Sequence, residues 1–294
     1  MDRNTLSHYG WIIVMILTLS IVLIMAGPFG NYVRDGAVHV LNEFSTAGNV
    51  DIGTLGETIE DENNEPTLIA PGLYESKDDL STPKVTWDEL ITQGIVSLDG
   101  TTVYVEMNEQ YEPLKDELLD GYLVLPSDGS VTAIGNAVTG DGGDYIVGHV
   151  GFYYCTKLTG ILIPDTVTSL SLYAFYMCDA LEDITFSSGI AEMADGAIIC
   201  CDRLTEIVIP EGSITIGREG IAGCRGLTTI TLPSTLTEVH YEAFYGNTAL
   251  TDIYYNGTKA QWDALFNENE FKSPTILTLH CNDGTTHLLA PPAC

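Results

Sequence analysis

From residue 147 to residue 255 the apolar residues recur at one fixed spacing of 23 positions, through five copies. Three of the columns follow one another in the order Leu, Ile and a third large apolar residue. They are Leu158, Leu181, Leu204, Leu227, Leu250; Ile161, Ile184, Ile207, Ile230, Ile253; and Ile163, Phe186, Ile209, Leu232, Tyr255. The second and third columns are two residues apart, so both side chains lie on one face of a short β-strand. Proline follows this strand in three copies and ends it by removing a backbone donor.

Three further columns keep the same step, two of them apolar and one of small residues. They are Val147, Leu170, Met193, Ile216, Val239; Phe152, Phe175, Ile198, Ile221, Phe244; and Gly151, Ala174, Ala197, Gly220, Ala243. One copy alone cannot bury its apolar side, whereas stacked copies share a continuous core. The pattern therefore predicts a solenoid with a short parallel β-sheet of stacked rungs and with turns or short helices on the other side.

The repeated motif A-F-x-x-C-x-x-L-x-x-I-x-I-P resembles the BspA-type leucine-rich repeats of bacterial and protozoan surface proteins. Residues 255–262 and the strand expected at 276–281 are similar to the C-terminal end of that family. The resemblance covers about residues 122–288. It implies a curved leucine-rich-repeat solenoid with a role in adhesion or protein interaction. The cysteine stands three residues before the leucine, unlike the commonest leucine-rich consensus, so the familiar deep horseshoe is not carried over.

Residues 9–29 carry no charge and are almost entirely apolar. At about 1.5 Å per residue they span roughly 30 Å as a helix, the thickness of a bilayer core. Residues 1–35 are therefore predicted to hold an N-terminal transmembrane helix, or uncleaved signal anchor. A signal peptide cut after Ala26 is the alternative. The first interpretation gives a single-pass membrane protein with an extracellular C-terminal domain, and the second gives a secreted protein.

The rest of the chain divides by composition and pattern. Residues 36–84 are acidic and lack sustained periodicity, which predicts a flexible linker. Residues 85–121 are expected to form a small N-terminal cap, in which Thr86 and Glu89 make a capping box. Within it we expect a strand over 101–105 and a helix over 114–119. The leucine-rich repeats are assigned to 122–255, and a C-terminal cap and tail to 256–294.

The charge is strongly acidic, with 41 Asp and Glu against 11 Lys and Arg and a formal net charge of −30. Phosphate binding needs a clustered basic surface, so nucleic acid is excluded as a partner. Adhesion to anionic lipid is disfavoured for the same reason. Acidity of this size keeps an exposed protein soluble. Calcium or a basic partner would also suit it.

Signatures of catalysis are missing from the sequence. It holds no phosphate-binding Gly-x-x-x-x-Gly-Lys-Ser/Thr, no His-Glu-x-x-His and no Gly-x-Ser-x-Gly. We therefore expect no enzyme, no cofactor and no metal site. Two weak metal candidates are the glycine-rich turn at 141–144, which suits calcium, and a C-terminal set without recognised zinc spacing. That set is His280, Cys281, His287, Cys294.

Four of the seven cysteines fill one slot of the repeat, and the fifth copy has asparagine there. The slot is Cys155, Cys178, Cys201, Cys224, Asn247. A position that accepts either residue is typical of a small buried site that bonds the turn backbone. Disulfide pairing between rungs and metal binding are the alternatives.

The outer face of the predicted sheet is the candidate binding surface. Because Ile161 and Ile163 face inward, Gly160 and Leu162 face outward, and the step of 23 extends both columns. The predicted ligand-binding residues are Asp183, Thr185, Glu206, Thr229, Thr231, Asp252, Tyr254. The alternative is an ordinary solvated strand face, since Thr is favoured on strands anyway.

These features favour a cell-surface binding protein, an adhesin or protein-interaction module. Its ligand would be a protein or a glycan on a cell surface, and the N-terminal helix would hold it to the membrane. The alternative is a structural envelope protein whose solenoid self-associates.

Overall fold

The computed structural model describes residues 69–109, 112–140, 146–188, 190–265, 276–284 and 286–289. The chain divides into two units, Met1–Leu68 and Ile69–Cys294, and the first unit lies outside the described residues. The predicted transmembrane helix at 1–35 and most of the predicted linker therefore also lie outside them. Within the described part of the chain no helix is both long and apolar enough to cross a membrane.

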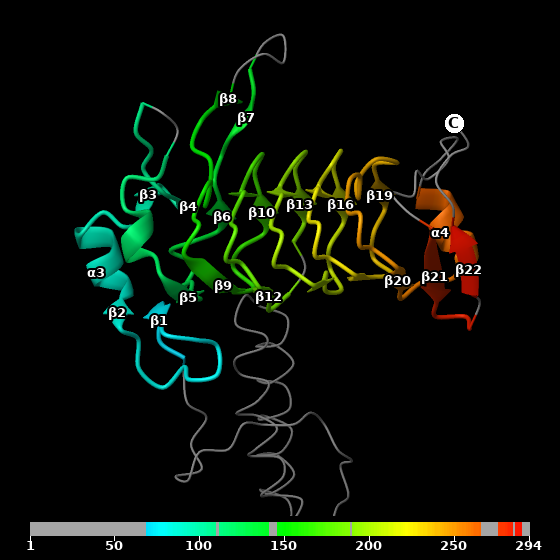
Figure 1. The fold of residues 1–294 in the computed structure, drawn as a ribbon, viewed down its shortest axis with the longest axis horizontal. Coiled ribbons are helices and arrows are strands. Elements are labelled where there is room, and N and C mark those ends of the chain that lie inside the picture. Colours follow the sequence, from blue (N-terminus) through cyan, green and yellow to red (C-terminus); the bar gives the residue numbers. More distant parts are fainter. Residues whose placement is uncertain are drawn as a thin grey trace, which may run out of the picture. The chain divides into compact units, whose positions relative to one another are not determined.

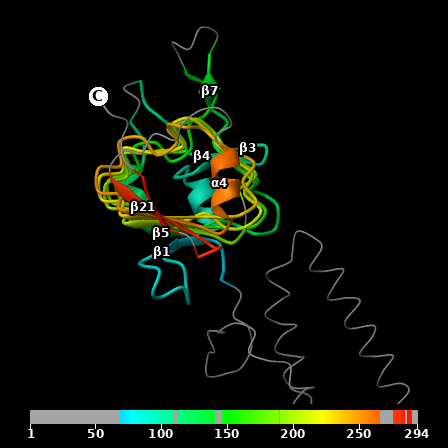
Figure 2. The ribbon, with the colours of Figure 1, turned by 90° about the vertical axis from the view of Figure 1, so that its right-hand side faces the viewer.

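The repeats form a solenoid in which each turn of 23 residues adds short strands to parallel ladders (Figure 1). Viewed along the stack, successive rungs superimpose (Figure 2). In each regular rung the Leu-x-x-Ile-x-Ile motif forms one strand of three to six residues. These strands are β9 (Leu158–Ile163), β12 (Asp183–Phe186), β15 (Glu206–Val208), β18 (Thr229–Leu232) and β20 (Asp252–Tyr255). They pair in the predicted register, with Ile184 opposite Ile161 and Ile230 opposite both Ile207 and Ile253.

These strands belong to two sheets, because no backbone ladder joins β12 to β15. The N-terminal sheet has the order β12-β9-β5-β1-β2, and the C-terminal sheet has the order β15-β18-β20-β21-β22. The remaining members are β1 (Gly72–Tyr74), β2 (Val85–Thr86), β5 (Gly121–Val124), β21 (Leu277–Cys281) and β22 (Thr286–Leu289).

Two further ladders lie along the stack, one of them in three rungs only. The first, called here the second sheet, has the order β19-β16-β13-β10-β6-β4-β3. Its strands are β3 (Ser97–Asp99), β4 (Thr102–Tyr104), β6 (Ala133–Ile134), β10 (Ser169–Leu170), β13 (Glu192–Met193), β16 (Thr215–Ile216) and β19 (Glu238–Val239). The other ladder joins β11 (Phe175–Tyr176), β14 (Ile198–Ile199) and β17 (Ile221–Ala222). The sequence predicted turns or short helices in this region. The structure has turns and two-residue strands, and no helix lies within the described part of the repeats.

Residues in the left-handed backbone region explain why the rungs turn without helices. One corner repeats at the same step, with φ of 55° at Tyr154, 53° at Met177 and 56° at Cys200, and with Gly223 and Gly246 at 65° and 76°. A residue at positive φ ends a right-handed helix, and glycine adopts this conformation without steric cost. Cys200, which lies outside the cysteine column, therefore occupies a corner position.

The predicted inward columns are buried throughout the described part of the repeats. The Leu column from Leu158 to Leu250 is at most 1% exposed, and Phe152 stacks on Phe175 with ring centroids 5.7 Å apart. Burial of one such side chain stabilises the fold by about 1.5–3 kcal/mol. The core therefore runs without interruption along the stack, as the spacing predicts.

The N-terminal cap follows the prediction in part. Helix α3 (Trp87–Thr92) begins after Thr86, whose Oγ1 accepts from the Glu89 backbone at 3.4 Å while the Thr86 backbone donates to Glu89 Oε2 at 2.9 Å. This confirms the capping box. The helix predicted over 114–119 is only a 3-10 turn, η1 (Asp116–Leu118), because Leu114 and Leu118 point to solvent and give it no apolar face. At the other end α4 (Lys259–Leu265) buries Trp262.

The predicted boundary of the linker at residue 84 is wrong. Strand β1 already pairs antiparallel with β5, Leu73 opposite Leu123, and both Leu73 and Tyr74 are fully buried. The acidic residues that follow β1 obscured this strand in the sequence. An uncovered first rung would leave its backbone edge and core open, and β1 closes that edge.

A hairpin interrupts the repeats before the first regular rung. Strands β7 (Val138–Thr139) and β8 (Ile146–Val147) pair antiparallel and project from the stack (Figure 1). The glycine-rich turn at 141–144, considered above for calcium, lies outside the described residues.

Candidate binding face

The structure divides the seven predicted binding residues between two sheets. Asp183 and Thr185 lie on β12 of the N-terminal sheet. The other five lie on the C-terminal sheet, where Thr229 stands opposite Glu206 and Asp252, and Thr231 stands opposite Tyr254. Their positions alternate with the buried Ile residues of the same strands, so they face outward.

The outer face of the N-terminal sheet is covered by the chain itself. The cover is formed by residues 69–84, and it contains Ile69 and Leu80. These side chains pack in one apolar cluster with Tyr74 and with outward-facing residues of β5 and β9, namely Tyr122, Val124, Leu162. Burial also raises the pKa of Tyr122. Sequence reasoning missed this cover because it assigned residues 36–84 to a linker.

Asp183 is bound within this covered region. Its Oδ1 lies 3.2 Å from Lys77 Nζ, and its Oδ2 accepts from Tyr122 Oη at 3.1 Å and from Thr185 Oγ1 at 2.8 Å. Because these three contacts within the chain already satisfy its carboxylate, Asp183 is not available to bind a ligand. Asp183 is therefore removed from the candidate face, and Thr185 stands at its edge.

The C-terminal sheet keeps an outer face that is open among the described residues. Glu206 is exposed, Val208 is 53% exposed and Tyr254 is 44% exposed. Thr229, Thr231 and Asp252 lie between them and are half-buried. The face thus combines one apolar side chain, one aromatic ring, hydroxyls and carboxylates on rigid neighbouring strands. Such a surface can offer shape and hydrogen bonds to a partner, and its negative charge favours cations.

Two residues of this face were missed by the 23-residue step. Strand β21 extends the sheet beyond β20, with Thr278 opposite Asp252 and His280 opposite Tyr254. Helix α4 lengthens the connection between these strands, so the step no longer holds there. The strand expected at 276–281 was the signal that could have added both residues.

His280 contacts two outward-facing residues of β20, Asp252 and Tyr254. Its Nε2 lies 2.7 Å from Asp252 Oδ1, and its ring stacks on Tyr254 with centroids 4.4 Å apart and planes 9° apart. The hydrogen bond from His280 is the main cause that lowers the pKa of Asp252. Asp252 therefore remains a carboxylate and holds the imidazole in place.

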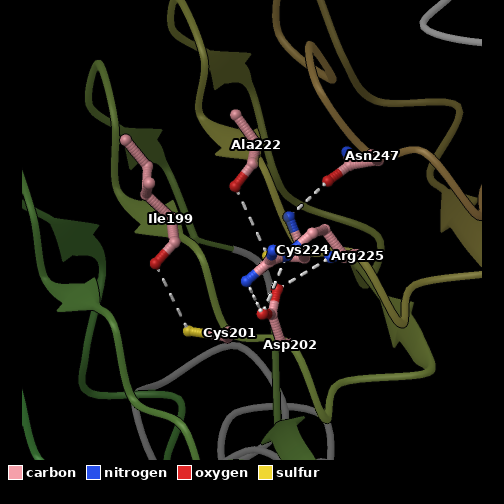
Figure 3. Close-up of polar contacts among 7 residues, drawn as sticks. All are labelled: Ile199, Cys201, Asp202, Ala222, Cys224, Arg225 and Asn247. Carbon is pink, nitrogen blue, oxygen red and sulfur yellow. Dashed lines mark hydrogen bonds and ion pairs between the residues drawn. The ribbon is translucent and has the colours of Figure 1, made fainter.

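The cysteine column has a structural role, as the sequence predicted. The Cys178 thiol donates to the Phe152 carbonyl at 2.8 Å. Figure 3 shows Cys224 with its thiol toward the Ala222 carbonyl, 3.5 Å away, and Asn247 pointing to the Cys224 backbone. No disulfide joins any of the six described cysteines, so the alternative of disulfides between rungs is not realised in this part of the chain. Burial raises the pKa of Cys155 and Cys178, which makes these thiols inert.

Among the described residues no group of three or more His, Cys, Asp or Glu side chains is arranged to hold an ion. In the C-terminal set, His280 is bound to Asp252 and Cys281 is buried. The His287 side chain and Cys294 lie outside the described residues.

Solved structures similar to this chain include three leucine-rich-repeat proteins. A leucine rich cell surface protein from Faecalibacterium prausnitzii is 28% identical over 60% of this chain and 43% of its own, with a TM-score of 0.44. A leucine rich repeat protein of T. pallidum is 23% identical over 51% of this chain and 67% of its own, with a TM-score of 0.38. A leucine-rich repeat protein from Bacteroides ovatus is 23% identical over 54% of this chain and 44% of its own, with a TM-score of 0.30.

This chain spans less than half the length of the Faecalibacterium prausnitzii protein. No curated protein matches the sequence. Residues 146–272, which hold the regular 23-residue rungs, match the BspA type leucine rich repeat region in six copies.

Proposed function

We propose that this chain is a cell-surface binding protein, an adhesin or protein-interaction module. The outer face of its C-terminal sheet contacts a protein or glycan on a cell surface. The apolar segment at 9–29 anchors it as a single-pass membrane protein with the repeats outside, or directs its secretion if it is cleaved. Residues 36–68 then act as an acidic spacer, the cap begins at β1, and the last cap follows residue 255.

One contrast supports the location of this binding face. On the first rungs an apolar outer face is packed against residues 69–84 of the same chain. On the later rungs Val208 and Tyr254 stand on the same side of the motif strands and remain exposed. A rigid face with an aromatic residue and an apolar residue among polar ones suits protein recognition, in which aromatic anchors contribute most of the affinity.

Paired charge reversals in the full chain test the proposal. Glu206→Lys with Asp252→Lys alters the C-terminal sheet, and Glu192→Lys with Glu238→Lys makes the same change in net charge on the second sheet. Binding to an immobilised cell-surface extract is measured for each variant by surface plasmon resonance. We expect the first pair to lose binding by about tenfold or more and the second to keep it. Equal binding by both variants would refute the proposed face. Self-association of the unaltered chain in sedimentation, without capture of a partner, would instead favour an envelope role.

A further inference from the structure

One segment of the chain itself packs on the outer face of the N-terminal sheet and shows how a peptide segment can bind there. In the cover formed by residues 69–84, Lys77 pairs with Asp183 across 3.2 Å. Beside this ion pair, Ile69 and Leu80 pack into the apolar cluster that lines the outer face of β5 and β9. The cover therefore combines one cation on a carboxylate with apolar side chains on the neighbouring column.

The same arrangement recurs on the next rung without a described occupant. Glu206 takes the position of Asp183, and Val208 takes the position of Thr185 and Leu162, one or two steps of 23 further along. None of the ion pairs between described residues includes Glu206. The carboxylate and the apolar side chain are both exposed.

The negative net charge of the chain favours a partner with positive charge. With a formal net charge of −30 and only 11 basic residues, the protein attracts cations and repels acidic partners. A neutral glycan would gain nothing from the carboxylate at Glu206 beyond a hydrogen bond. A lysine or arginine would gain a charge-assisted bond of the kind that Lys77 makes with Asp183.

On the basis of the proposed function, we propose that the partner is a protein that presents a surface segment with lysine or arginine between apolar residues. The cationic side chain pairs with Glu206, as Lys77 pairs with Asp183. The apolar side chains lie on Val208 and against the ring of Tyr254. The segment 69–84 is thus the internal counterpart of an external ligand.

Two peptide probes test this partner class against the full chain in detergent micelles. One is acetyl-Leu-Thr-Lys-Leu-Thr-Lys-Leu-amide, and the other carries glutamine in place of both lysines. Backbone amide shifts report the site, and titration reports affinity. We expect the lysine peptide to shift Glu206, Thr229 and Thr231. In Glu206→Lys it should bind roughly fivefold or more weakly, because one exposed ion pair becomes a repulsion. The matched control Glu238→Lys, an exposed site on the second sheet, should leave that affinity within about twofold.

The inference is overturned if the glutamine peptide binds as tightly as the lysine peptide, or if Glu206→Lys and Glu238→Lys weaken binding equally. The second result would mean that only net charge attracts the peptide. Failure of the proposed function can be told apart. If Glu206→Lys with Asp252→Lys abolishes capture from the cell-surface extract while the lysine peptide does not bind, the face is functional and the partner is not basic.

Discussion

Asn247 fixes the backbone of Cys224 in the preceding rung, because its Oδ1 accepts the Cys224 N–H at 2.9 Å. Its amide nitrogen donates to the carbonyls of Ile221 and Phe244 at 2.8 and 3.0 Å. The side chain is fully buried. In the last rung asparagine thus supplies the bonds to the turn that cysteine thiols supply in the earlier rungs.

Asn247→Ala should destabilise the repeats by about 2–4 kcal/mol, because it leaves buried backbone groups without partners. Denaturant unfolding followed by circular dichroism measures the loss. Asn256→Ala is the matched control, since Asn256 is exposed and makes one bond of 3.3 Å to Glu211. It should cost under about 0.5 kcal/mol. Similar losses in both variants would contradict a structural role for the Asn247 bonds.

The cysteines should differ sharply in reactivity. Burial raises the pKa of Cys155, Cys178 and Cys200, but the first two are fully buried whereas Cys200 is only half-buried at its corner position. Alkylation of the native chain at pH 8, followed by peptide mass mapping, should modify Cys200 before the column cysteines, which stay intact until unfolding. Rapid native labelling of Cys178 would be inconsistent with the packed column.

The His280 bond should be visible in the titration of Asp252. The hydrogen bond from His280 holds the pKa of Asp252 below its ordinary value of 3.8. A depressed carboxyl pKa adds stability that is present above the unfolded value and is lost as the pH falls through the folded value. Carboxyl chemical shifts should therefore give a low midpoint for Asp252, and His280→Phe, which keeps a ring beside Tyr254 but has no donor, should move it upward. An unchanged midpoint in that variant would assign the shift to another group.

Residues 69–84 should behave as part of the cap. Leu73 is fully buried in β1, so Leu73→Ala should cost about 2–5 kcal/mol. Lys77 is 59% exposed, so Lys77→Ala should cost under about 1 kcal/mol despite its ion pair. Thermal unfolding separates the two variants. A negligible effect of Leu73→Ala would restore the flexible linker that the sequence predicted for this segment.

The repeats could be predicted from the sequence because the same requirement for burial recurs in every rung. Every rung must bury the same columns, so Leu158, Ile161 and their equivalents predict strand, register and inward face together. The ends lack this redundancy. Gly72-Leu73-Tyr74 is too short to show a period, and neighbouring acidic residues made it look like a linker.

In the candidate site, too, the residues within the repeats could be predicted and the contacts made by the caps could not. The outward positions of Glu206, Thr229 and Tyr254 followed from the alternation of their strands. The sequence could not show that Lys77 pairs with Asp183 and so removes it from the candidate face, because that contact joins residues 106 positions apart. His280 was missed because α4 breaks the step. A long-range contact of a cap depends on packing that no local pattern encodes.

The most direct test of the binding face is site-specific photo-crosslinking in the full chain. A photoreactive amino acid replaces Thr231 on the C-terminal sheet or Thr215 on the second sheet, both half-buried Thr positions of the repeats. After irradiation with a cell-surface extract, mass spectrometry identifies the adducts. The proposed function predicts one partner protein or glycoprotein linked through position 231 and not through 215. Adducts at 215 alone, or equal adducts at both positions, would contradict it.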